Sequence, residues 1–184
     1  MTRAALLPID VQCGLDDPAQ GARSTPEAEA QIARLLAVWR ALGWPIVHVQ
    51  HLSTNPASRL RPGMPGVAIK PEAMPLPGEP VVQKSVNAAF IGTDLESRLR
   101  ADGVKAVVIV GLTTDHCVSS TARMAGDLGF ETTVVADATA AFERTAWDGR
   151  HLSADTVWTT SLATLQDEFA RIITTADLLA ALPR

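Results

Sequence analysis

The chain has 184 residues, of which 47% are hydrophobic and 20% carry a charge. This is ordinary usage for a globular protein of about one domain, so the composition excludes a disordered chain and a coiled coil. The net charge of −4 and the lack of a basic run argue against nucleic-acid binding, and two cysteines are too few for a disulfide framework or a structural zinc module.

No stretch of the chain has the pattern of a targeting or membrane-spanning segment. The first apolar run, at residues 4–9, stops at Asp10, so it lacks the length and the cleavage pattern of a signal peptide. No run approaches the roughly 18 apolar residues that a spanning helix needs. We therefore expect a cytoplasmic protein that does not bind membranes.

Strand-like and helix-like segments alternate along the chain. Short, nearly continuous apolar runs predict strands buried on both faces, and they lie at residues 4–9, 45–49, 81–82, 106–110, 132–135 and 170–173. Helical spacing, with Pro26 and a Thr93-x-x-Glu96 capping box as start signals, predicts helices at about 27–42, 93–102, 115–128, 153–168 and 176–182. This alternation predicts one α/β domain over residues 1–184, a parallel sheet covered by helices on both faces.

Residues 52–80 interrupt this rhythm. They contain seven of the twelve prolines and three glycines, without convincing periodicity. A loop of this length in a compact domain is usually functional or disordered, and one that follows a strand leaves from the sheet edge where α/β proteins bind ligands. We interpret it as a wall of the substrate pocket, with a plain surface excursion as the alternative.

The strongest chemical signal is the sequence GLTTDHCV at residues 111–118, which lies between a predicted strand and the next helix. Cys117 falls in the first turn of that helix, where unpaired N–H groups and the helix dipole favour a thiolate and can stabilise an oxyanion. The alternative is an inert buried cysteine, which is the commoner role of this residue type.

Two further ionisable residues follow predicted strands. Asp10 ends the first strand, and Lys84 comes just after the strand at 81–82. In a doubly wound sheet the first strand lies beside the strand that follows the crossover, which would place Asp10 and Cys117 on one crevice. There a carboxylate can take the thiol proton, and a lysine favours both anions. Taken alone, Asp10 equally suits a cap, and Lys84 a solvated strand end.

Together these stretches resemble the isochorismatase-like cysteine hydrolases. The resemblance rests on LLPIDVQ at 6–12, on Lys84 with AFIGTDL at 89–95, and on GLTTDHCV at 111–118 with Thr121-Ala122 and Gly129 beyond it. It spans nearly the whole chain. It implies a three-layer αβα fold with a six-stranded parallel sheet in the order 3-2-1-4-5-6, a small-molecule substrate, no cofactor and a homo-oligomer.

Carried over residue by residue, the resemblance assigns a catalytic triad. Asp10 is the general base, Cys117 the nucleophile, and Lys84 the group that orients and charge-stabilises them. The family also implies a cis peptide bond between Leu112 and Thr113. That bond would aim the Thr113 N–H, together with the N–H of Cys117, at the developing oxyanion.

Other residues receive lesser roles. Candidates for contact with the substrate are Gln12, His51, Phe90 and Leu112, although Phe90 equally suits the core. We expect Cys13 to be a packing residue and Asp137 to be a turn or helix cap. Residues 147–151 have the character of an exposed loop that suits contact with a neighbouring subunit.

The chain departs from two branches of the family. Nicotinamidases have an Asp-x-His element and further histidines that bind a metal, whereas this chain has HVQH at 48–51. Positions three apart on a strand point to opposite faces, so we predict that neither His48 nor His51 binds a metal. Isochorismatases proper lack the cysteine nucleophile, and Cys117 therefore favours amide hydrolysis through a thioester.

Three functional hypotheses follow. The first is a cysteine-dependent hydrolase that cleaves the C–N bond of a small amide. The second keeps the triad but changes the bond to an ester or a vinyl ether. The third is a binding protein that kept the fold without turnover, and a Cys117 thiol titrating above about 8.5 would favour it.

Overall fold

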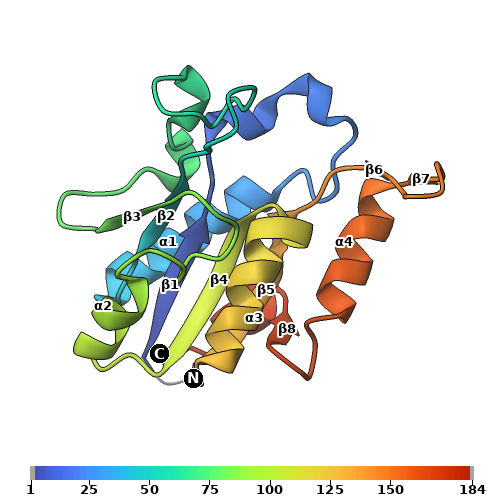
Figure 1. Cartoon of the computed structure of the whole chain (residues 1–184). Coiled ribbons are helices and arrows are strands. Elements are labelled where there is room, and N and C mark those ends of the chain that lie inside the picture. The colour runs from blue at the N-terminus through green and yellow to red at the C-terminus, as the bar shows by residue number, and fades with distance from the viewer. Residues whose placement is uncertain (1–2, 183–184) are drawn as a thin grey trace.

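The computed structural model describes residues 3–182, and its centre is a parallel sheet of six strands (Figure 1). Their order is β3-β2-β1-β4-β5-β8, with the bounds β1 Ala4–Ile9, β2 His48–His51, β3 Val81–Lys84, β4 Ala106–Leu112, β5 Glu131–Ala140 and β8 Arg171–Ile173. The predicted parallel sheet and strand order are confirmed. The last strand is the eighth in the chain because β6 (Arg144–Thr145) and β7 (His151–Leu152) precede it as a separate antiparallel pair.

Helices cover both faces of the sheet, which confirms the three-layer αβα fold. On one face lie α1 (Ala28–Leu42) and α5 (Thr175–Ala180), and on the other lie α2 (Leu95–Ala101), α3 (Ser119–Asp127) and α4 (Ala154–Ala163). Successive side chains of a strand point to opposite faces. Leu7 of β1 therefore packs under α2 and α3, whereas Leu6 packs under α1. Among residues 3–182, no helix combines the length and the apolar content that crossing a bilayer requires.

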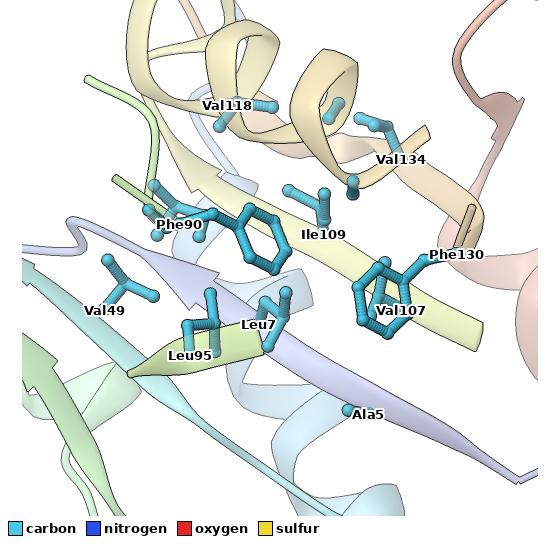
Figure 2. Close-up of a cluster of buried hydrophobic side chains, with 14 of the residues drawn as sticks. Ala5, Leu7, Val49, Phe90, Leu95, Val107, Ile109, Val118, Phe130 and Val134 are labelled. Atoms are coloured by element: carbon cyan, nitrogen blue, oxygen red, sulfur yellow. The ribbon is translucent and has the colours of Figure 1, made fainter. Parts of the chain in front are cut away.

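The apolar cluster under α2 and α3 lies against the middle of the sheet (Figure 2). Leu7 of β1 and Ile109 of β4 are fully buried in it, together with Leu95 of α2 and Val118 beside α3. The cluster thus holds β1 and β4 side by side. Their carboxyl ends, where the chemical residues were predicted, are fixed relative to one another as a result.

The predicted capping box at the start of α2 is wrong. The Thr93 hydroxyl donates to the Ala89 carbonyl at 2.6 Å and accepts from the N–H of Leu95 at 3.3 Å, and α2 begins only at Leu95. Glu96 pairs instead with Arg100, one turn along the surface of α2. The sequence pattern was present, but the hydroxyl of Thr93 bonds within the turn before α2, to the carbonyl four residues earlier.

Other element boundaries also differ from those predicted. The expected helix at 115–128 is divided into a π-helical turn, η5 (Thr114–Val118), and α3, and α4 ends at Ala163 rather than at 168. β5 runs on to Ala140, past Asp137, whose carboxylate accepts hydrogen bonds from the N–H and hydroxyl of Thr175 at 2.7 and 2.9 Å. The N-cap of α5 is Thr174, and Asp137 is a strand residue that binds the first residue of this helix from β5, not the turn or helix cap that was predicted.

Candidate active site

Three strand ends bring the predicted triad together. Asp10 directly follows β1, Lys84 is the last residue of β3, and Cys117 lies in η5, just after β4. Because all of these strands are parallel, their carboxyl ends lie at one edge of the sheet. The separation of the three residues along the chain is therefore no obstacle to contact between their side chains.

The Lys84 ammonium lies at the centre of the site. Its Nζ donates to Asp10 Oδ2 at 2.6 Å, to the carbonyl of Val86 at 3.1 Å and to Cys117 Sγ at 3.3 Å, and it lies 3.1 Å from His51 Nδ1. The side chain of Lys84 has no exposed surface, and that of Asp10 is 2% exposed. A charge-assisted hydrogen bond in such a dry setting is strong and directional. The structure thus brings Asp10, Lys84 and Cys117 into one contact group.

The backbone around this group has unusual conformations. Asp10 has φ of +50°, the left-handed region that side chains rarely adopt, and the peptide bond between Leu112 and Thr113 is cis, as the resemblance implied. Gly111 has φ of +117°, and a Cβ there would lie 2.1 Å from the carbonyl oxygen of Ile9. Only glycine suits that position. Left-handed residues that a fold retains despite their cost cluster at functional sites.

A π-helical turn places Cys117. In η5 the N–H of Val118 donates to the carbonyl of Thr113 at 3.2 Å, a five-residue spacing, while the N–H of His116 reaches the same carbonyl at 3.2 Å. Single π-helical turns are rare and occur often at functional sites. The sequence predicted an ordinary helix start here, because a π turn has no signature in composition or periodicity.

Burial is the largest cause of the pKa shifts of Asp10, Cys117 and His51. It raises the pKa of Asp10 from 3.8 to about 6, although the charge of Lys84 and a hydrogen bond with Cys117 act in the opposite direction. Burial and the negative charge of Asp10 raise the pKa of the Cys117 thiol from 9.0 to about 12. Burial and the charge of Lys84 lower the pKa of His51 to about 4. At neutral pH the site holds a carboxylate, a thiol and a neutral imidazole.

A cavity of about 300 Å³ opens onto this group. Its walls include Asp10 and Cys117, and also three residues that were predicted to touch a substrate or an oxyanion: His51, Leu112 and Thr113. The sequence missed the remaining wall residues, which are Leu15, Gln20, Leu60, Asn87, His116 and Arg144. Two of them lie on irregular chain and four on helical turns or a strand of two to five residues, and such short segments have no periodicity that predicts their path. Leu60 belongs to the 52–80 loop, which is therefore a wall of the cavity.

Two of the predicted substrate contacts lie elsewhere. Phe90 is a core residue: it is 7% exposed, and its ring stacks on that of Phe130 with centroids 5.9 Å apart. Gln12 has no exposed surface. Its amide donates to the carbonyls of Val67 and His51 at 2.9 and 3.1 Å and accepts from the His51 N–H at 2.8 Å. Neither residue lines the cavity, so both predictions change to structural roles.

Cys13 is exposed rather than packed, which contradicts the prediction. The N–H of Cys13 donates to the carbonyl of Ala68 at 2.9 Å. The backbone of Cys13 therefore holds the 52–80 loop, and its thiol has no part in that contact. The two cysteines thus differ clearly: Cys117 is 9% exposed and lines the cavity, and Cys13 faces solvent.

Metal binding is a poor fit to these residues. Donor atoms of Asp10, His51 and Cys117 lie within 4.8 Å of one another, but Lys84 Nζ contacts all three, and its positive charge opposes a cation there. His48 points away from the group, with Nε2 2.9 Å from Glu79 Oε2. The two histidines thus lie on opposite faces, as their spacing predicted.

Comparison with known proteins identifies the family. The family model described as "Isochorismatase domain" matches residues 4–177, and the chain belongs to that family. It is 45% identical over 177 residues to an uncharacterised isochorismatase family protein, YrdC, of Bacillus subtilis, covering 96% of this chain and 95% of the relative. A solved structure of an isochorismatase-family protein from Chromobacterium violaceum is 48% identical, with a TM-score of 0.94 over 97% of this chain and 93% of that one.

Two more distant relatives have names that describe chemistry. A cysteine hydrolase from Pseudomonas syringae pv. phaseolicola is 26% identical, with a TM-score of 0.88 over 97% of this chain and 91% of that one. A ureidoacrylate amidohydrolase from Rhizobium rhizogenes is 31% identical over 113 residues, which cover 61% of this chain and 42% of the relative. The chain is thus an isochorismatase-family hydrolase.

Proposed function

We propose that this protein is a cysteine amidohydrolase that cleaves the C–N bond of a small amide through a thioester on Cys117. The main support is the position of Lys84 Nζ, 2.6 Å from Asp10 and 3.3 Å from Cys117 beside a small cavity. A nucleophile, a base within reach and a third group that orients both are the parts of nucleophilic catalysis. The amidohydrolase among its relatives is consistent with a C–N bond as the target.

In the proposed first half-reaction, Asp10 accepts the thiol proton as Cys117 Sγ attacks the amide carbonyl carbon. The N–H groups of Thr113 and Cys117 hold the resulting oxyanion. The intermediate collapses, the C–N bond breaks, and the amine leaves with the proton from Asp10. In the second half-reaction Asp10 takes a proton from water, the hydroxide attacks the thioester carbonyl, and the C–S bond breaks to release the acid and return the proton to sulfur.

The pKa of Cys117, raised to about 12, is the opposite of the thiolate expected at this helix start, and it meets the criterion set above for the binding-protein hypothesis. Here, however, the negative charge of Asp10 is one cause of the high pKa, and Asp10 is the group that takes the proton. Nucleophiles that work with an adjacent general base start from the protonated state. A base with a pKa near 6 is also close to the operating pH, where general-base catalysis is most effective. These points favour the enzyme over the binding protein.

The test is a screen of small amides with wild-type protein, Cys117→Ala and Cys13→Ala. We expect turnover by wild type and Cys13→Ala, with loss of at least about a thousandfold in Cys117→Ala. Intact-mass measurement during turnover should detect an acyl adduct in wild type that Cys117→Ala lacks. Turnover of a verified substrate by Cys117→Ala at the wild-type rate would contradict the mechanism. Turnover of esters with no detectable turnover of the matching amides would contradict the choice of bond.

A further inference from the structure

Arg144 is a cationic wall residue of the catalytic cavity that the triad chemistry does not use. It lies on β6 and lines the same cavity as Cys117, with 30% of its side chain exposed. Its Nε and Nη2 lie 3.0 and 2.9 Å from Asp115 Oδ2. Asp115 is two residues before Cys117 in η5, so the turn that places the nucleophile also holds this guanidinium.

The ion pair leaves part of the guanidinium available. A guanidinium has five N–H donors, and Asp115 engages only the edge formed by Nε and Nη2. Nη1 has no hydrogen-bond partner within residues 3–182, although the side chain borders the cavity. An anchored guanidinium loses little further side-chain entropy when it binds an anion, and its planar donor fork matches a carboxylate.

The rest of the cavity wall does not oppose an anion. Its one acidic wall residue among those described is Asp10, which Lys84 neutralises at 2.6 Å. Besides Arg144, the other titratable wall residues are Cys117, a neutral thiol because its pKa is raised, His51, a neutral imidazole because its pKa is lowered, and His116, which is 57% exposed. Arg144 is therefore the wall residue best able to attract a negatively charged group of a ligand.

We propose that Arg144, anchored by Asp115, binds a carboxylate of the substrate. The cavity of about 300 Å³ is at the lower end of the range for small-molecule sites. The substrate class is accordingly a short amide with a carboxylate a few bonds from the scissile carbonyl. This inference rests on the proposed function for the role of Cys117, and Arg144 is then a specificity-determining residue.

Alkylation of the two cysteines tests this without a known substrate. Iodoacetate and iodoacetamide transfer similar groups to sulfur with loss of iodide, but iodoacetate has a carboxylate. Mass spectrometry gives the rate ratio of the two reagents at Cys117, and exposed Cys13 is the internal reference. We expect the iodoacetate-to-iodoacetamide ratio at Cys117 to exceed that at Cys13.

Variants assign the preference to Arg144 itself. Arg144→Met should lower the Cys117 ratio by about tenfold, the effect of one hydrogen bond between charged groups, and Arg144→Lys should restore part of it. Arg150→Met is the matched control, because Arg150 lies on the same hairpin, is 73% exposed and pairs with Asp148. An unchanged ratio in Arg144→Met, or an equal loss in Arg150→Met, would overturn the proposal.

A binding experiment separates this inference from the proposed function. In Cys117→Ala, calorimetry compares succinamate with butyramide, which has a methyl group in place of the carboxylate. We expect tighter binding of succinamate, and loss of that difference when Arg144→Met is added. Equal binding of the two probes would overturn the carboxylate site even if amide turnover is found, and a clear difference would support the site even if no amide is turned over.

Discussion

Lys84 makes four polar contacts with a side chain that has no exposed surface. An ammonium ion in such a place is tolerated only if its hydrogen bonds are satisfied, because its desolvation costs several kcal/mol. These contacts hold Asp10 and Cys117 next to one another on the same ammonium group. They also leave Asp10 Oδ1 without a partner among residues 3–182, so one carboxylate oxygen is available for a proton.

The pH dependence of turnover should report Asp10. The active form is the carboxylate, and the pKa of Asp10 is raised to about 6. We expect kcat/KM for an amide found in the screen to rise about tenfold per pH unit below pH 6 and to level off above it. Steady-state rates between pH 4.5 and 8 measure this.

The variant His51→Gln tests whether Asp10 or His51 causes the inflection of kcat/KM near pH 6. An ordinary histidine titrates near 6.5, but the pKa of His51 is lowered to about 4. His51→Gln should therefore keep the inflection near pH 6, although its activity is lower. If the inflection disappears in His51→Gln, Asp10 is not the base.

The sequence predicted those site residues that directly follow regular elements. Asp10, Lys84 and Cys117 each stand at or just beyond a strand end, and the order of a doubly wound sheet brings strand ends together. Asn87 and Arg144 line the same cavity, but they lie on irregular chain after β3 and on a two-residue strand. Gln12 and Phe90 follow Asp10 and Lys84 in sequence, but the Gln12 side chain is taken up by hydrogen bonds and the Phe90 ring packs in the core. Closeness in sequence does not predict the direction of a side chain.

At the scale of elements, the pairing of β1 with β4 determines the site geometry. Every β1 residue from Ala4 to Ile9 has a partner on β4, and the last pair is Ile9 with Gly111. The register between β4 and β5 shifts just there, between Ile109 and Gly111. The irregularity coincides with the turn toward Cys117, and glycine at 111 lets the two backbones approach closely.

Replacement of Gly111 should be far more harmful than that of another left-handed glycine. In Gly111→Ala the new Cβ would overlap the backbone of Ile9, so we expect a loss of about 3 kcal/mol or more in the free energy of unfolding. Gly103→Ala is the control, because Gly103 also has positive φ but open space around it, and should lose about 1 kcal/mol. Urea unfolding measures both, and equal losses would contradict the close-approach explanation.

The 52–80 loop has little regular structure, yet it is firmly held. Besides Gln12, which binds the Val67 carbonyl, the N–H of Lys70 donates to the Val11 carbonyl at 2.9 Å. The Lys70 ammonium, on a residue that is 4% exposed, pairs with Glu29 of α1 at 2.6 Å and with Asp16. The sequence predicted a pocket wall here but could not predict its path, because these contacts join distant segments.

Gln12 should be necessary for that wall. Gln12→Ala removes three hydrogen bonds, at about 1 kcal/mol each, so we expect a loss of about 3 kcal/mol on unfolding and faster proteolysis within 52–66. Gln83→Ala is the matched control: Gln83 is exposed, its side chain bonds only to Gln50 within residues 3–182, and the change should alter stability by less than about 0.5 kcal/mol. Proteolysis of Gln12→Ala at the wild-type rate would contradict this role.

At the scale of the whole molecule, burial is greatest in the middle of the sheet and decreases outward. All residues of β1 and β4 are buried, whereas β3 at the edge alternates exposed and buried residues. The β6–β7 hairpin projects from the sheet (Figure 1), and Trp147 at its turn is 97% exposed, as predicted for residues 147–151. The homo-oligomer implied by the resemblance stays a prediction.

Amide hydrogen exchange should follow this gradient. We expect the slowest exchange in β1 and β4, at rates set by global unfolding, and exchange faster by about two orders of magnitude or more in β3 and the hairpin. Mass spectrometry of peptic fragments measures this in the native protein. Equal protection of β3 and β4 would show instead that the edge is covered, for instance by a second copy in the expected oligomer.

The anchoring of the 52–80 loop makes the course of the cavity wall largely independent of the side chains that decide which molecules fit. Its anchors near Val67 and Ala68 are backbone atoms of the loop, so the course of the wall does not depend on most of the side chains displayed along it. Leu60 reaches the cavity and supplies none of those anchors. Exchanging it for a larger or a polar residue should change which molecules fit while the wall and the triad stay in place. The same scaffold is therefore adaptable to new small molecules by substitutions that leave its folding intact.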